Sequence, residues 1–328
     1  LLPRRRLTTL TRLADLLDAH EQSRETVSAG ASWRQAEIIA GCEVNMFELK
    51  EFDEIAALHG NPPFLPSPQI RQSLYTIVAI ALLITVLHLA ILKTYQIRYS
   101  HSKGYNNEKA WEVSYHFTSL MVNFLLGVLG LYHYTRTIPH PASGATRVVG
   151  WEEMGILGCI QMGCQLWALP VGYFFVNETA AMLGHHVQVM VVGALATFFT
   201  NGFRYSTPFF FGLVEVSSVP LSIMNHFKAN PDLIASYPGL YLAIRMVFMV
   251  AFIYIRVFMW APNMYGFLHD CGILCFTCDN NLCRAGLGAS CLAGVGLTGL
   301  QLMWASMILR GFLKILAGGK KNKRQKTA

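Results

Sequence analysis

Apolar residues fill long stretches of this chain, with few polar positions inside them. Seven stretches reach the length of about 17–25 residues that a helix needs to cross the hydrocarbon core of a membrane. They lie at residues 73–94, 113–134, 154–176, 180–200, 207–226, 239–261 and 291–316. A membrane β-strand would be about ten residues long and alternate in polarity, whereas GILGCIQMGCQLWALPVGYFF at 155–175 does not alternate. The pattern predicts an all-α integral membrane protein with seven transmembrane helices.

Composition supports the same class. Of the 328 residues, 53% are hydrophobic and 14% are charged, whereas soluble domains carry about 25% charged residues. The net charge is +7, and the C-terminal KKNKRQKTA holds five Lys or Arg residues. No soluble folded domain accompanies this tail, so we expect it to lie against anionic lipid headgroups and expect no nucleic-acid partner.

The apolar stretches divide the chain into parts. We expect a polar, partly helical segment at 1–70, a first transmembrane helix at 71–95, a six-helix domain at 110–317 with a cysteine-rich loop at 262–290, and a basic tail at 318–328. Pro208 and Pro220 bracket the fifth stretch, which we therefore expect to be the least regular helix.

Basic residues near the ends of the stretches predict the orientation. Short-range Lys and Arg number five on the N-terminal side of the membrane and ten on the other side, tail included. This asymmetry predicts a cytosolic C-terminus and an N-terminus across the membrane. The glycosylation sequon Asn177-Glu178-Thr179 then faces the cytosol next to the membrane, and we expect it to be unmodified.

Four histidines fall in one layer near the predicted cytosolic face. His116 opens the second stretch, His185 and His186 lie near the start of the fourth, and His226 ends the fifth. Ionisable groups in lipid cost about 2.5–3.5 kcal/mol on insertion scales and usually face a bundle interior or a water-filled cavity. Interhelical hydrogen bonds, worth about 0.6 kcal/mol each, are the alternative explanation for these histidines.

Further polar residues surround this layer. Glu215 lies near the middle of the fifth stretch, where a carboxyl is either neutral or paired with a cation such as Arg245 of the sixth. Asn225 and Lys228 lie at the cytosolic end of the fifth stretch. These positions predict a cavity that opens toward the cytosol.

Three segments resemble the TLC-domain family, which includes the ceramide synthases. They are WEVSYHFTS at 111–119, MLGHHVQVMVVG at 182–193 and STPFFFGLVEVSSVPLSIMNHFK at 206–228. The resemblance covers about 110–317 and implies six helices around a lipid cavity, with the first helix added to them. In ceramide synthases the His pair belongs to the site that transfers an acyl group from acyl-CoA to a sphingoid amine.

Carried over to this sequence, the resemblance implicates His185 and His186 in catalysis. An imidazole can take a proton from an attacking amine or accept the acyl group itself. Ceramide synthases follow the pair with an Asp-rich stretch, whereas residues 207–230 contain no Asp and offer Glu215 instead. The Glu-x-Ser…Pro pattern through Pro220 is more similar to the TLC-domain proteins that are not ceramide synthases.

We expect the catalytic candidates to be His185, His186 and Glu215. The candidates for substrate binding are His116, Asn225, His226, Lys228 and Arg245. We expect no cofactor and no bound metal, with acyl-CoA as a possible co-substrate. A nucleotide-bearing donor needs a basic mouth, which Lys228, Arg245, Arg310 and Lys314 would supply.

The first functional hypothesis is acyl transfer in an internal membrane, expected to be the endoplasmic reticulum, with membrane lipids as partners. The alternatives are a non-catalytic lipid regulator or cargo receptor and a structural subunit of a membrane assembly. Small-residue faces at 127–130 and 288–299 suit helix contacts within one chain or between chains. Protein partners and oligomeric state stay open.

Cysteines concentrate in the predicted loop before the last stretch. HDCGILCFTCDNNLC contains Cys271, Cys275, Cys278 and Cys283. A disulfide is the favoured interpretation, because this loop is expected on the non-cytosolic side. A metal site and free or lipidated thiols remain alternatives.

Overall fold

The computed structural model describes residues 68–101, 105–137, 147, 154–199, 203–277 and 281–325. The polar segment expected at 1–70 lies outside the described residues except for its last three positions. The side chains of the basic tail also lie outside them.

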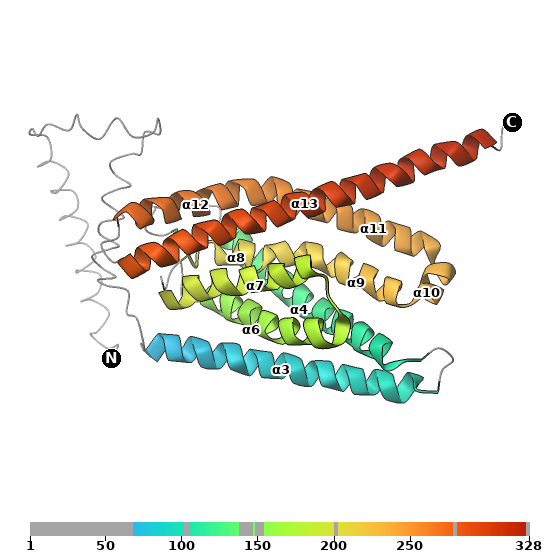
Figure 1. Cartoon of the computed structure of the whole chain (residues 1–328), viewed down its shortest axis with the longest axis horizontal. Coiled ribbons are helices and arrows are strands. Elements are labelled where there is room, and N and C mark those ends of the chain that lie inside the picture. Colours follow the sequence, from blue (N-terminus) through green and yellow to red (C-terminus); the bar gives the residue numbers. More distant parts are fainter. Residues whose placement is uncertain are drawn as a thin grey trace, which may run out of the picture. The chain divides into compact units, whose positions relative to one another are not determined.

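Seven helical passes in the described part of the chain are long and apolar enough to cross a membrane. The passes are α3 (Pro68–Tyr99), α4 (Asn107–Thr137), α6 (Gly155–Val171), α7 (Ala180–Ala194), the pair α8 (Thr207–Phe210) and α9 (Ser218–Ala229), the pair α11 (Pro238–Ile253) and α12 (Trp260–Thr277), and α13 (Asn281–Gln325). A short helix, α10 (Pro231–Ser236), joins α9 to α11 (Figure 1). No strand occurs among these residues. The predicted all-α membrane class with seven spans is confirmed.

Successive passes run in opposite directions, so the chain reaches the same end of the helical bundle on alternate passes. The C-terminal end of α3, the start of α4 and α10 lie at one end, which we call the α10 end (Figure 1). The predicted cytosolic face corresponds to this end.

The fifth pass is the least regular and the most buried of the seven, with 61% of its most apolar window buried. After α8 the helix breaks at Gly212 and continues as a 3-10 turn, Leu213–Ser217, before α9 begins. The backbones of Gly212 and Gly130 of α4 approach so closely that a Cβ on either residue would overlap the other. The expected irregularity is confirmed, and it holds Glu215 in the bundle interior.

The two small-residue faces both make contacts within the chain. Gly127 and Gly130 lie against the 3-10 turn of the fifth pass, where a Cβ on Gly127 would be 3.1 Å from Val216. On α13, a Cβ on Gly294 would lie 3.2 Å from Met264 of α12, and one on Gly296 would lie 3.1 Å from Gln188 of α7. Small residues at these points let the helices approach closely.

The predicted cysteine-rich loop at 262–290 is wrong, because α12 continues to Thr277 and α13 begins at Asn281. Met264, Phe267 and Cys271 of this helical segment are buried in the largest hydrophobic cluster. Arg147 holds the same segment through two hydrogen bonds to Asp270, of 2.9 and 3.0 Å. Core packing and this ion pair explain why the helix extends beyond the apolar stretch.

The expected disulfide is wrong for the two cysteines of the cluster whose side chains are described. Cys271 and Cys275 are free thiols. Cys271 is fully buried, and its side chain interacts with that of Cys291 on α13. Cys278 and the side chain of Cys283 lie outside the described residues.

Candidate functional site

A cavity of about 550 Å³ lies inside the bundle among α4, α6, α7, α9, α11 and α13. Six of the eight predicted site residues line it: His116, His185, His186, Glu215, Asn225 and Lys228. We call this space the polar chamber. It brings together most of the layer that the sequence predicted.

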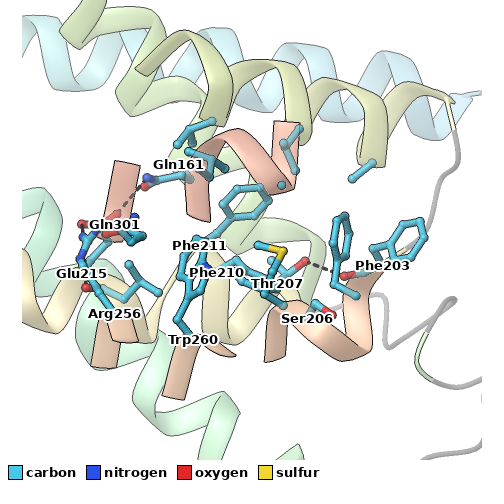
Figure 2. A pocket seen from close by; sticks show the side chains of 18 of the residues that line it. Gln161, Phe203, Ser206, Thr207, Phe210, Phe211, Glu215, Arg256, Trp260 and Gln301 are labelled. Atoms are coloured by element: carbon cyan, nitrogen blue, oxygen red, sulfur yellow. Dashed lines mark hydrogen bonds and ion pairs between the residues drawn. The ribbon is translucent and has the colours of Figure 1, made fainter. Parts of the chain in front are cut away.

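A narrower space of about 50 Å³ continues from the polar chamber through the bundle. Its walls are mainly apolar and include the aromatic side chains of Phe203, Phe210, Phe211 and Trp260 (Figure 2). We call it the apolar sleeve. Gln161, His185, Glu215 and Arg256 line both spaces. The two spaces therefore meet at a ring of polar side chains.

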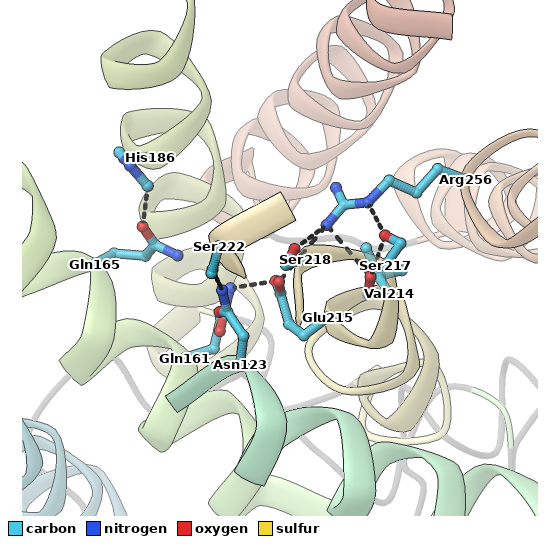
Figure 3. A network of polar contacts seen from close by, with 10 residues as sticks. All are labelled: Asn123, Gln161, Gln165, His186, Val214, Glu215, Ser217, Ser218, Ser222 and Arg256. Carbon is cyan, nitrogen blue, oxygen red and sulfur yellow. Dashed lines mark hydrogen bonds and ion pairs between the residues drawn. The ribbon is translucent and has the colours of Figure 1, made fainter. Parts of the chain in front are cut away.

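Glu215 is held at this junction by two partners. Its Oε1 accepts a hydrogen bond of 3.1 Å from Gln161 Nε2, and its Oε2 lies 3.5 Å from Arg256 Nη2 (Figure 3). Both side chains of the ion pair are less than a tenth exposed. A buried carboxylate needs such a cation and such hydrogen bonds to offset its desolvation.

Arg256 is fixed in turn by the broken backbone of the fifth pass. Its guanidinium donates to Ser217 Oγ at 2.7 Å, to Ser218 Oγ at 2.8 Å and to the Val214 carbonyl at 3.3 Å. It projects from a π-helical turn, Tyr254–Met259, between α11 and α12. Such turns are frequent at functional sites.

Arg245, which we expected as a partner of Glu215, does not fill that role. Its guanidinium lies over the ring of Tyr241, 5.7 Å from the centroid, and Arg245 does not line the polar chamber. Arg256, about three helical turns further along the chain, forms the ion pair instead. Hydropathy places both arginines inside the sixth pass but does not say which one faces Glu215.

The two adjacent histidines have different surroundings. His186 Nδ1 is hydrogen-bonded to Oε1 of Gln165 on α6, and its Nε2 is buried without a partner among the described residues. His185 packs edge-on against Trp304 of α13, with ring centroids 5.3 Å apart, and its Nδ1 also lacks a partner there. Interhelical hydrogen bonding thus accounts for one of these three nitrogens.

Other unpartnered polar atoms gather in the same place. Within the described part of the chain, Gln161 Oε1 and both side-chain polar atoms of Gln301 are buried without a hydrogen-bond partner. Each such atom costs about 1–3 kcal/mol. With the nitrogens of His185 and His186 they line the chamber or the sleeve. The junction therefore holds hydrogen-bonding groups that no described residue satisfies.

The mouth of the polar chamber combines acidic and basic groups. His116 Nε2 lies 3.8 Å from Glu112 Oε1, and Glu178 and Lys228 complete the rim. Burial raises the pKa of Glu178, although His116 and a hydrogen bond with Tyr115 act in the opposite direction. Of the four cations expected at a basic mouth, Lys228 lines the chamber, whereas Arg245, Arg310 and Lys314 do not.

His226 does not line the polar chamber either. It lies in a separate groove with the ends of α3 and α4. Sequence reasoning missed Arg256, Gln161 and Gln165. Gln161 and Gln165 are four residues apart in an otherwise apolar helix, and this spacing puts both on one helix face. The spacing of these two glutamines was the feature of the sequence that could have predicted a polar helix face.

Comparison with known families adds one finding. The family model of the TLC domain matches residues 106–310, which is well over half of the chain. The matched range contains the whole junction and leaves α3 outside. No curated protein and no solved structure gives a significant match.

Proposed function

Because the chain belongs to the TLC-domain family, we propose that it is a lipid-handling membrane enzyme that transfers an acyl chain from acyl-CoA to a lipid amine. The observation that carries the proposal is the junction itself. A narrow apolar sleeve, with room for a short segment of a hydrocarbon chain, meets a polar chamber where His185 and His186 have unpartnered ring nitrogens.

His186 is the proposed general base. Since Nδ1 donates to the amide oxygen of Gln165, Nε2 carries the lone pair. Nε2 takes a proton from the attacking amine while the amine nitrogen bonds to the carbonyl carbon of the thioester. The C–S bond then breaks, and the proton passes to the leaving thiolate, so the products are an amide and free CoA.

Arg256 and Glu215 have supporting roles in this proposal. The Arg256 guanidinium lines both spaces and supplies a fixed positive charge where the carbonyl oxygen becomes negative. Glu215 and the hydroxyls of Ser217 and Ser218 hold that guanidinium in place. Glu215, a catalytic candidate from the sequence, becomes a positioning residue.

The charges at the mouth favour an amine as the acceptor. Glu112 and Glu178 offer carboxyl oxygens to an entering ammonium group, and Lys228 is the single lysine of the lining. The α10 end would face the cytosol, because ends rich in Lys and Arg stay on that side. The proposed compartment is the endoplasmic reticulum.

The test uses the full chain in lipid, with acyl-CoA and a panel of sphingoid and lysolipid acceptors, read by mass spectrometry. His186→Gln should lower the rate about 100-fold or more, as expected for the loss of a general base. His101→Gln, an exposed histidine outside the chamber, is the control and should leave the rate unchanged. An amide product that forms equally fast in both variants would contradict the proposed role of His186.

A non-catalytic lipid carrier or regulator is the second candidate. It is favoured by the full engagement of Glu215 with Arg256 and Gln161, which leaves no free carboxylate at the junction. Under this alternative no acceptor yields product, but a lipid copurifies with the protein and is lost from His186→Gln.

A further inference from the structure

A second large groove lies at the α10 end of the bundle, between α3, α4 and the connection from α9 to α10. Its volume is about 720 Å³, and it shares no lining residue with the polar chamber. It contains His226, which the sequence had assigned to the central cavity. We call it the α3–α4 groove.

The lining of the α3–α4 groove changes from charged to apolar along both helices. On α3, Arg98 lies at the end of the helix and Ile91 about two turns deeper. On α4, Lys109 lies in the first turn and Phe117 about two turns deeper. Tyr95, whose ring packs on Tyr99 at a centroid distance of 4.7 Å, lies between these levels. This gradient matches a lipid that has its headgroup at the membrane surface and a chain in the interior.

The polar part of the groove carries an excess of positive charge. Arg98 has no ion-pair partner among the described residues, while Lys109 interacts electrostatically with Glu112. Asp232 is the one carboxylate in the lining. In the same part of the chain, His226 Nδ1 is buried without a hydrogen-bond partner. The groove therefore offers one cation, Arg98, and one buried ring nitrogen of His226 that have no partner among the described residues.

We propose that the α3–α4 groove binds an anionic glycerophospholipid from the adjacent leaflet. Arg98 and Lys109 hold its phosphate, because charge-assisted hydrogen bonds to a phosphate are among the strongest that such side chains make. One acyl chain lies along Ile91, Val113 and Phe117. Six of the fourteen lining residues belong to α3, which lies outside the range that matches the TLC domain. The bound lipid would thus join the added helix to the domain.

Native mass spectrometry of the full chain in mild detergent tests the proposal, with phosphatidylserine and phosphatidylcholine of identical chains as probes. The wild type should retain one phosphatidylserine in preference to phosphatidylcholine. Arg98→Gln/Lys109→Gln should weaken phosphatidylserine binding about tenfold or more, as loss of charged hydrogen bonds implies. Phosphatidylcholine should lose less affinity, because its choline cation already offsets part of the attraction between its phosphate and the two basic side chains.

The matched control is Arg71→Gln/Lys93→Gln, which removes one Arg and one Lys from exposed positions of α3 outside the groove. It should leave the affinity unchanged. Equal weakening in both double variants would overturn the proposal in favour of general surface attraction. Ala90→Trp, an exposed groove position, should displace the lipid without changing the charge, and retention of the lipid in this variant would also overturn it. Competition by free glycerol 3-phosphate at the same concentration would indicate a soluble phosphate ester in place of a lipid.

Discussion

Replacing Arg256 by Met tests the buried ion pair that organises the junction. The variant keeps an apolar chain of similar length but removes the cation beside Glu215, 3.5 Å away in the wild type. Removing one partner of a buried pair costs about 3–5 kcal/mol, since the other charge stays behind. The hydroxyl of Ser217 still donates to the Val214 carbonyl at 2.8 Å, so the orphaned carboxylate accounts for most of this cost.

Combining Arg256→Met with Glu215→Gln removes both charges and should recover most of the loss. The substituted amide can keep a hydrogen bond to Gln161, which approaches to 3.1 Å in the wild type. We expect the double variant to lose about 1–2 kcal/mol relative to wild type. Glu215→Gln by itself should also cost about 1–2 kcal/mol, because Arg256 keeps three oxygen acceptors.

The assay is reversible unfolding by SDS in mixed micelles, followed for the wild type and the three variants. A coupling free energy of about 4 kcal/mol between the two positions is expected from these values. Costs that simply add, or an Arg256→Met variant as stable as wild type, would refute the argument that this pair is buried and mutually dependent.

Three further predictions concern packing, pH and topology. Gly130→Ala should destabilise the protein, because its Cβ would overlap the backbone of Gly212. Gly299→Ala, whose Cβ would have no atom within 4 Å, should stabilise the protein by up to about 1 kcal/mol. Unfolding in SDS compares the two variants, and similar changes in stability would contradict the close approach of Gly130 and Gly212. Burial raises the pKa of Glu178 above its ordinary value of 4.5, so this carboxyl binds its proton more tightly in the folded state than in the unfolded state. The free energy of unfolding that Glu178 contributes therefore declines as pH rises above 4.5. Glu178→Gln should therefore raise the melting temperature at neutral pH and lose that advantage in acid, and a pH-independent difference would disprove the assignment. Asn177, in the turn before α7 at the α10 end, should remain unglycosylated in eukaryotic cells, and a glycosidase-sensitive mass shift would show that this end is not cytosolic.

Hydropathy predicted the seven passes well because each contains enough apolar residues to cross a membrane. It failed at 262–290, where the helix is stabilised by core packing and by the contact of Asp270 with Arg147. These contacts join residues far apart in the chain, and no local pattern records them. Pro208 and Pro220 predicted an irregular fifth helix, but nothing in the sequence predicted the close approach of Gly212 to Gly130.

The site was predicted in part for a similar reason. His185, His186 and Glu215 stand out in the sequence because polar residues are costly in apolar stretches. Arg256 carries the same signal, yet its role depends on the direction in which a π-helical turn points it. The assignment of His226 to the cavity followed from its depth, and depth does not distinguish the two sides of one helix.

In the proposed complex, a lipid lies with its head in the polar chamber and the start of its chain in the apolar sleeve. The most direct measurement uses a long-chain amine with a photoreactive diazirine at the end of its chain, crosslinked to the protein in lipid and mapped by mass spectrometry. We expect labelling of sleeve residues such as Val192 and Phe210, and loss of this labelling in Arg256→Met/Glu215→Gln. Labelling confined to the lipid-exposed side chains Leu82 and Val86 of α3 would contradict it.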